Sequence, residues 1–260
     1  MKELNEFERK GWIKFEYDQR IVRWAKVANS KIIAKQKNKE NFENGLTCQG
    51  TWFVGVDALD NNPDGTLDEV PLQGPFENLM KRSKVHGLHP AQVSIIFEGY
   101  PKPRDQESES SFNFRLKRDA AHIDGLIADF PGGPRKLKEP HAYVLGIPLN
   151  QVPKGASPVV IWEGSHHLIS EAFERFFLNR TPHEWRDIDI REVYFETRKS
   201  IFKKCIRRIL HANVGESYMV HRLCLHGISP WNSKIKNFYE GRRIAYFRPE
   251  LKDIANWPKL

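Results

Sequence analysis

Residues 142–149 read AYVLGIPL, and residues 158–162, one turn later, read PVVIW. Both runs are short, apolar and rich in β-branched or aromatic side chains, which is typical of buried strands. Further strand-like runs lie on either side of them: QVSIIF (92–97), FNFRLK (112–117), ESYMVHRLCL (216–225) and RIAYF (243–247). These runs do not alternate regularly with helices, as a parallel doubly wound sheet would require. The sequence therefore predicts a mainly β protein with a sandwich or barrel core.

The rest of the chain predicts helices that flank this core. Apolar residues recur at helical spacing in 7–12, 21–28 and 167–178, and residues 181–184 have the form of a capping box. A basic cluster between Lys199 and Arg208 carries a helical apolar stripe, so we expect a surface helix there. We expect one domain over 1–260, with N-terminal helices and loops in 1–90, strands in 91–163 and 215–250, and a helical insert in 164–214.

The composition limits the possible settings of the protein. Among 260 residues no apolar run reaches the roughly 20 that span a bilayer, and the N-terminus lacks the apolar core of a secretory signal. Three cysteines (Cys48, Cys205 and Cys224) cannot all pair, which favours a reducing, cytoplasmic setting. The net charge of +8 favours anionic partners. Without interleaved aromatic residues, however, the basic cluster is better explained as a solvated helix face than as a nucleic-acid site.

Two histidines and an aspartate are candidate metal ligands. His122 and Asp124 are separated by one residue, so on an extended strand both side chains point to the same face, whereas on a helix they diverge. His226 follows about a hundred residues later. Two imidazoles and one carboxylate can bind one face of Fe(II) and leave other positions open. Cys224 and His221 are weaker candidates, because the first fits a small apolar strand residue and the second is expected on the opposite face from His226.

Several short motifs follow one another along the chain. They are Phe-x-x-x-Gly-Trp (7–12), His-x-Asp (122–124), Gly-Ser-His (164–166), and a His-Gly segment (226–227) that leads to Asn-Ser (232–233) and then to Arg242 and Arg243. In this order and spacing they resemble the phytanoyl-CoA dioxygenase-like family of Fe(II)/2-oxoglutarate-dependent oxygenases. The resemblance extends from residue 7 to about 250, over nearly the whole chain. It implies a double-stranded β-helix (jelly-roll, cupin-like) core with flanking helices.

The resemblance also assigns roles to individual residues. It makes His122, Asp124 and His226 the ligands of one Fe(II), with 2-oxoglutarate and O₂ as co-substrates. Arg242 becomes the anchor of the distal carboxylate of 2-oxoglutarate, for which a guanidinium fork is suited. Arg243 stays an alternative, since the interval after His226 is longer than the family norm. Alternation along a strand lets only one of the two arginines face the pocket.

The implied reaction is the oxidation of an unactivated C–H bond with release of succinate and CO₂. Halogenating relatives lack the carboxylate ligand, so Asp124 favours hydroxylation or desaturation. The substrate is expected to be a small molecule or an acyl compound, and the positive charge is compatible with an anionic one. Two alternatives are a non-catalytic cupin-like metal or ligand binder and, less favoured, a nucleic-acid-associated protein that uses the basic cluster.

Overall fold

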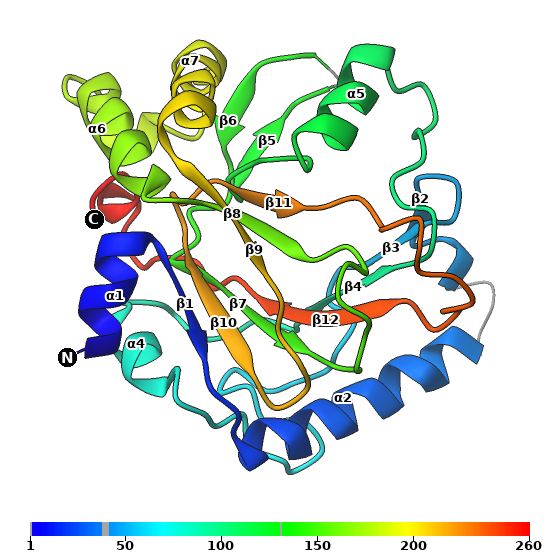
Figure 1. Cartoon of the computed structure of the whole chain (residues 1–260). Coiled ribbons are helices and arrows are strands. Elements are labelled where there is room, and N and C mark those ends of the chain that lie inside the picture. Colours follow the sequence, from blue (N-terminus) through cyan, green and yellow to red (C-terminus); the bar gives the residue numbers. More distant parts are fainter. Residues whose placement is uncertain (1, 38–41, 131) are drawn as a thin grey trace.

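The computed structural model describes residues 2–37, 42–130 and 132–260, so residues 1, 38–41 and 131 of the predicted domain lie outside it. Two antiparallel sheets form its centre (Figure 1). The larger sheet has the strand order β1-β10-β7-β12-β4-β3-β2, the smaller one has β11-β8-β9, and β5 and β6 form a separate pair. The strands are β1 Trp12–Phe15, β2 Leu46–Thr47, β3 Trp52–Gly55, β4 Gln92–Ile96, β5 Leu126–Ala128, β6 Arg135–Leu137, β7 Tyr143–Pro148, β8 Val159–Glu163, β9 Ile206–Leu210, β10 Ser217–His221, β11 His226–Ile228 and β12 Arg242–Phe247.

The helices lie outside the two sheets. They are α1 Lys2–Lys10, α2 Gln19–Lys37, α4 Glu77–Arg82, α5 Glu109–Lys117, α6 Ser165–Phe177 and α7 Arg191–Lys204, with 3-10 turns η1 Pro182–Glu184 and η2 Ile254–Asn256. The first ninety residues therefore supply strands β1, β2 and β3 as well as helices. No helix within the described part of the chain is long and apolar enough to cross a membrane.

The two sheets face each other across an apolar interior. Inner side chains of the larger sheet, such as Val144, Val220 and Ile244, pack with Val159 and Ile161 of the smaller sheet. This arrangement of a larger and a smaller antiparallel sheet is the double-stranded β-helix that the sequence predicts.

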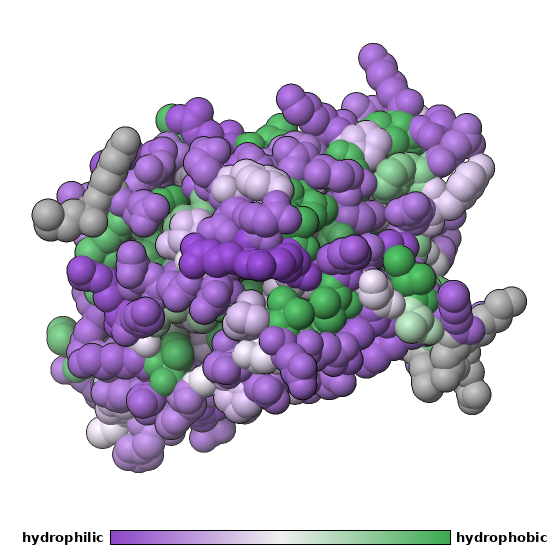
Figure 2. Space-filling view, turned by 90° about the horizontal axis from the view of Figure 1, so that it is seen from below, coloured by the Kyte–Doolittle hydropathy of each residue, from purple (hydrophilic) through white to green (hydrophobic). Residues whose placement is uncertain are grey.

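Helices cover the outer faces of both sheets. On the larger sheet, α2 buries Ile21, Trp24 and Ala28, spaced one helical turn apart, in one cluster with Phe247 of β12. Figure 2 shows the molecule from the α2 side, where hydrophilic side chains predominate and hydrophobic ones form small separate patches. On the smaller sheet, α6 and α7 pack in one cluster with Trp162 of β8. The side chains of this cluster lie outside the smaller sheet, so other side chains fill the interior between the two sheets.

The structure corrects the strand predicted for residues 112–117, which is the helix α5. The alternation of apolar and polar residues was misleading because local and tertiary contacts favour a helix. The Ser108 side chain caps the first turn by accepting the backbone N–H of Ser111. The helix also buries Arg115, whose Nε donates to Glu107 Oε1 at 2.7 Å.

The structure also corrects the single helix predicted over the basic cluster. Helix α7 ends at Lys204, and residues 206–210 form β9, which pairs with β8. Arg207 binds the Asp119 carboxylate through two 2.8 Å hydrogen bonds, while Arg208 Nη2 lies 3.4 Å from Glu163 Oε1. The cluster is therefore divided between two elements and partly neutralised by carboxylates.

Candidate metal centre

The alternation of inward and outward side chains positions the predicted ligands. Ile123 is 2% exposed and packs with Tyr194 in the cluster formed by α6 and α7. Its neighbours His122 and Asp124 consequently point the other way, into the space between the sheets. Leu225 packs in the same outer cluster and likewise turns His226 inward.

A close backbone approach brings the two histidine segments side by side. His122 and His226 exchange both backbone hydrogen bonds, at 2.8 and 3.0 Å, and the Ile228 N–H donates to Asp119 O at 2.8 Å. Gly227 lies under this segment, where a Cβ atom would be only 2.1 Å from the Asp119 carbonyl oxygen. Glycine is therefore required at position 227 for this pairing. The extended setting in which His122 and Asp124 share a face is present, and the pairing partner of His122 is His226, at the start of β11.

The side-chain donors of the three residues converge. Asp124 Oδ1 lies 3.1 Å from His122 Nε2 and 3.8 Å from His226 Nε2, and the three ligand atoms all lie within 4.8 Å of one another. On the other side of each ring, His122 Nδ1 lies 2.8 Å from Ala120 O and His226 Nδ1 lies 2.9 Å from Cys224 O. These carbonyls favour a proton on Nδ1, which leaves both Nε2 lone pairs free for a metal. The donor set fits Fe(II).

Electrostatics keep the donors in the states that a metal needs. Burial disfavours the charged form of Asp124, yet Arg248, His122 and His226 together hold its pKa well below the usual value. Burial lowers the pKa of His226, and the negative charge of Asp124 opposes this only in part. The site therefore contains an ionised carboxylate and a neutral imidazole.

The ligands line one wall of a cavity of about 280 Å³ between the sheets. Its other walls are mostly apolar, with a few polar side chains from β3, β4, β10 and β12. The lining residues that the sequence analysis did not single out include Trp52, Gln92, Ser94, Tyr218, Tyr246 and Arg248. Side chains alternate between the two faces of a strand. The sequence could therefore identify these lining residues only if the inward face of each strand were already known.

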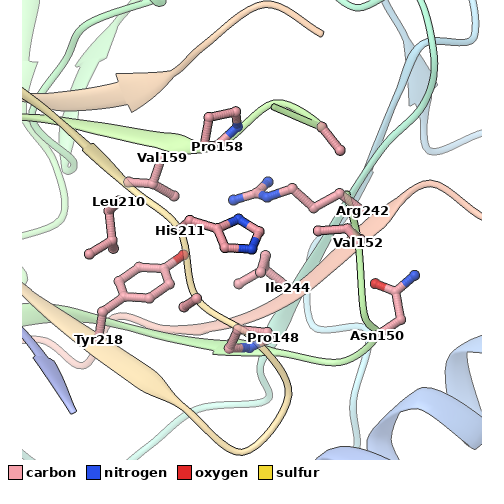
Figure 3. Close-up of a pocket in the computed structure, with 12 residues that line it drawn as sticks. Pro148, Asn150, Val152, Pro158, Val159, Leu210, His211, Tyr218, Arg242 and Ile244 are labelled. Carbon is pink, nitrogen blue, oxygen red and sulfur yellow. The ribbon is translucent and has the colours of Figure 1, made fainter. Parts of the chain in front are cut away.

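The two candidate arginines point to opposite faces of β12. Arg242 shares the inner face with Ile244, and both line a narrow space of about 10 Å³ (Figure 3). Arg243 faces α2, where its Nη1 lies 3.2 Å from Asn29 Oδ1 and its Nη2 lies 3.1 Å from Gln36 Oε1. Arg243 thus fastens a helix outside the sheet, while Arg242 belongs to the interior.

Arg242 has a buried guanidinium without an acidic partner. The residue is 4% exposed, its Nη1 has no hydrogen-bond partner, and no carboxylate among the described residues forms an ion pair with it. Its Nη2 lies 3.4 Å from the Tyr246 hydroxyl, which in turn accepts from Tyr218 at 3.1 Å. Gly146 leaves room for this series of hydrogen-bonded side chains, because a Cβ there would lie 2.2 Å from the Tyr218 ring. A buried cation in this state is suited to an anionic ligand.

The space around Arg242 adjoins the metal-site cavity. Val159 and Tyr218 line both. In Figure 3 the Arg242 side chain extends from β12 toward His211 and Tyr218, between the two sheets. Two residues that border the ligand cavity thus also border the space that Arg242 lines.

The weaker ligand candidates lie elsewhere. His221 is on the outer face of β10, where its ring centroid lies 5.2 Å from that of His166 and 5.8 Å from that of Phe7. It is separated from β11 by a turn, so the two histidines are not on one strand. Cys224 is free and buried, and burial raises its thiol pKa to about 12. Neither residue belongs to the ligand cluster.

Comparisons with known proteins show the fold. No protein-family model and no curated protein sequence matches the chain. The solved structure of SnoK, a non-haem α-ketoglutarate-dependent carbocyclase from nogalamycin biosynthesis, matches with a TM-score of 0.52 and 10% identity, over 96% of this chain and 83% of its own. EvdMO1 matches with a TM-score of 0.50 and 13% identity, over 96% of this chain and 50% of its own. EctD from S. alaskensis, solved with bound Fe, gives 0.46 and 14%, over 96% and 76%. The chain thus shares its double-stranded β-helix fold with SnoK.

Proposed function

We propose that this protein is a non-haem Fe(II)- and 2-oxoglutarate-dependent oxygenase. The proposal rests on two features that lie in the interior between the two sheets. A cavity with two imidazoles and a carboxylate shares lining residues with the space around a buried guanidinium that has no carboxylate partner in the part of the chain the structure describes. 2-Oxoglutarate is a dianion with a keto-acid end that chelates a metal and a distal carboxylate that needs a cation, so it matches both features.

The chain's own residues have separate tasks in this proposal. His122, Asp124 and His226 would hold the iron, and Arg242 would bind the distal carboxylate, with the hydroxyl of Tyr246 beside it. The bound iron and keto acid supply oxidation of a C–H bond by O₂, with release of succinate and CO₂. The other walls of the cavity are mostly apolar, while the His122 side chain is 45% exposed, so this ligand borders solvent.

Within this class we propose hydroxylation of a small molecule. The intact Asp124 carboxylate occupies the position that a halogenating enzyme leaves for halide. The cavity is of small-molecule size and mostly apolar, with Arg248 as a cation in its wall, and an anionic group on the substrate would suit that charge. SnoK, with the same fold, is a carbocyclase, so the reaction outcome is a separate question from the cofactor chemistry.

Anaerobic titration with Fe(II) and 2-oxoglutarate, followed by admission of O₂, tests the proposal. We expect one Fe(II) per chain, a visible absorption band that requires both iron and the keto acid, and slow succinate formation even without substrate. The His226→Ala variant is the matched control and should lose all three signals. Iron binding with neither the absorption band nor succinate would favour the non-catalytic metal binder instead. Absence of iron binding would refute the metal site itself.

A further inference from the structure

The two oxygens of the Asp124 carboxylate have different partners. Oδ1 faces the two histidines, at 3.1 Å from His122 Nε2 and 3.8 Å from His226 Nε2. Oδ2 faces Arg248, whose Nη1 lies 3.5 Å away. Asp124 is largely buried, with its side chain 11% exposed, so few other groups compete for Oδ2. The carboxylate is therefore held with one oxygen toward the metal position and the other toward a guanidinium.

Arg248 is itself held in place from neighbouring elements. Its Nη2 donates to Gln92 Oε1 of β4, the strand that pairs with β12 in a register that sets Tyr246 opposite Gln92. Its backbone carbonyl lies 3.0 Å from His89 Nε2. Because the guanidinium is a planar fork, contact with Gln92 fixes the direction in which Nη1 points toward Asp124.

We propose that Arg248 is a positioning residue that keeps Asp124 a one-oxygen ligand of the metal. The proposal rests on the proposed function, because its consequence concerns the count of coordination positions. Two histidines and one carboxylate oxygen leave three of six octahedral positions, which suffices for a keto acid and O₂ together. A carboxylate that binds through both oxygens leaves only two positions. Holding Oδ2 away from the metal is thus a requirement for oxidation and not for metal binding.

This role predicts a separation of cofactor binding from reaction with O₂. In Arg248→Met all three ligands remain, and Asp124 becomes free to use both oxygens, so metal binding should persist. 2-Oxoglutarate can still take the two remaining positions, so its binding should persist as well. With Fe(II), succinate formation should fall about 10- to 100-fold, the usual effect on activity of losing a partner of a metal ligand. Arg248→Lys keeps the positive charge but replaces the planar fork by an ammonium group, which does not fix the direction of a donor toward Asp124. If positioning is the role, Arg248→Lys should resemble Arg248→Met in both measurements.

Co(II) serves as the probe, since its visible absorption reports coordination without any turnover. We would titrate wild type, Arg248→Met and Arg248→Lys with Co(II), record the spectra, and then add 2-oxoglutarate. Arg243→Lys is the matched control, because Arg243 lies on the outer face of β12, the strand that ends just before Arg248. We expect Co(II) and 2-oxoglutarate binding by all four proteins and a changed Co(II) spectrum in the two Arg248 variants alone. With Fe(II) and O₂, those two variants alone should lose most of their succinate formation.

Three results would overturn the proposal. The first is a wild-type Co(II) spectrum and wild-type succinate formation in Arg248→Met. The second is a wild-type result for Arg248→Lys beside a defective Arg248→Met, which would assign the effect to charge and not to orientation. The third is loss of Co(II) binding in folded variants, which would make Arg248 a part of metal retention. If the wild type bound Co(II) but no 2-oxoglutarate, the proposed function would fail, while the spectral comparison would still test Arg248.

Discussion

Replacing Arg242 by methionine should change ligand affinity and protein stability in opposite directions. Without ligand, the Arg242 guanidinium is 4% exposed, has no carboxylate partner among the described residues, and leaves Nη1 without a hydrogen bond. A buried polar group in that state costs about 1–3 kcal/mol. Methionine fills a similar volume without a charge, so Arg242→Met should leave the free energy of unfolding unchanged or raise it by about that amount.

The same substitution removes a buried inner-face guanidinium that, among the described residues, has no carboxylate partner and so can bind a distal carboxylate. Losing one partner of a buried charge pair costs about 2–5 kcal/mol, which corresponds to an increase of about 30- to 4,000-fold in Kd. In the wild type, 2-oxoglutarate at 100 times its Kd should stabilise the Fe(II)-loaded protein by about 2.7 kcal/mol. A chain of this length gains about 2–4 °C in Tm per kcal/mol, and Arg242→Met should lose this gain.

Anaerobic thermal unfolding of Fe(II)-loaded protein, with and without 2-oxoglutarate, measures both effects in one assay. Arg243→Met is the matched control, because Arg243 binds Asn29 and Gln36 on α2. Its loss should lower the Tm but preserve the shift that 2-oxoglutarate causes. The reverse pattern, with the shift lost in Arg243→Met and retained in Arg242→Met, would refute the assignment of inner and outer faces on β12.

Three further predictions concern the ligand cluster and its support. Gly227→Ala should unfold at lower temperature and bind Fe(II) weakly by equilibrium dialysis, because its Cβ would lie 2.1 Å from Asp119 O; wild-type binding would contradict the argument from close approach. His226→Ala should stay folded by circular dichroism but lose iron-dependent succinate formation, and retained turnover would remove His226 from the site. The free energy of unfolding should fall as the pH drops from about 6.5 to about 4. Burial lowers the pKa of His166 to about 4, so over this range the unfolded chain binds a proton that the folded protein does not. The His166→Gln variant should show a shallower pH dependence of the unfolding free energy, and an unchanged slope would count against this.

Much of the fold followed from the local pattern of the sequence. The runs that became β4, β7, β8, β10 and β12 are rich in β-branched and aromatic residues, and burial in the sheets agrees with that preference. The segment 112–117 shows the limit of such patterns. Its alternation fitted a strand, but the Ser108 cap and the buried pair of Arg115 with Glu107 favour a helix. The alternation of apolar and polar residues within 112–117 does not reveal these contacts, because Ser108 and Glu107 lie outside that segment.

The sequence by itself determined which residue types are available for metal chemistry and in what order. The one-residue spacing of His122 and Asp124, together with a later His226, predicted three donors that the structure brings within 4.8 Å. The tertiary structure decided which side chains surround them. Strand alternation allowed either Arg242 or Arg243 inside, and only the packing of α2 on one face of β12 placed Arg242 in the interior. Arg248 meets Asp124 through the pairing of β12 with β4, a long-range contact that no local spacing encodes.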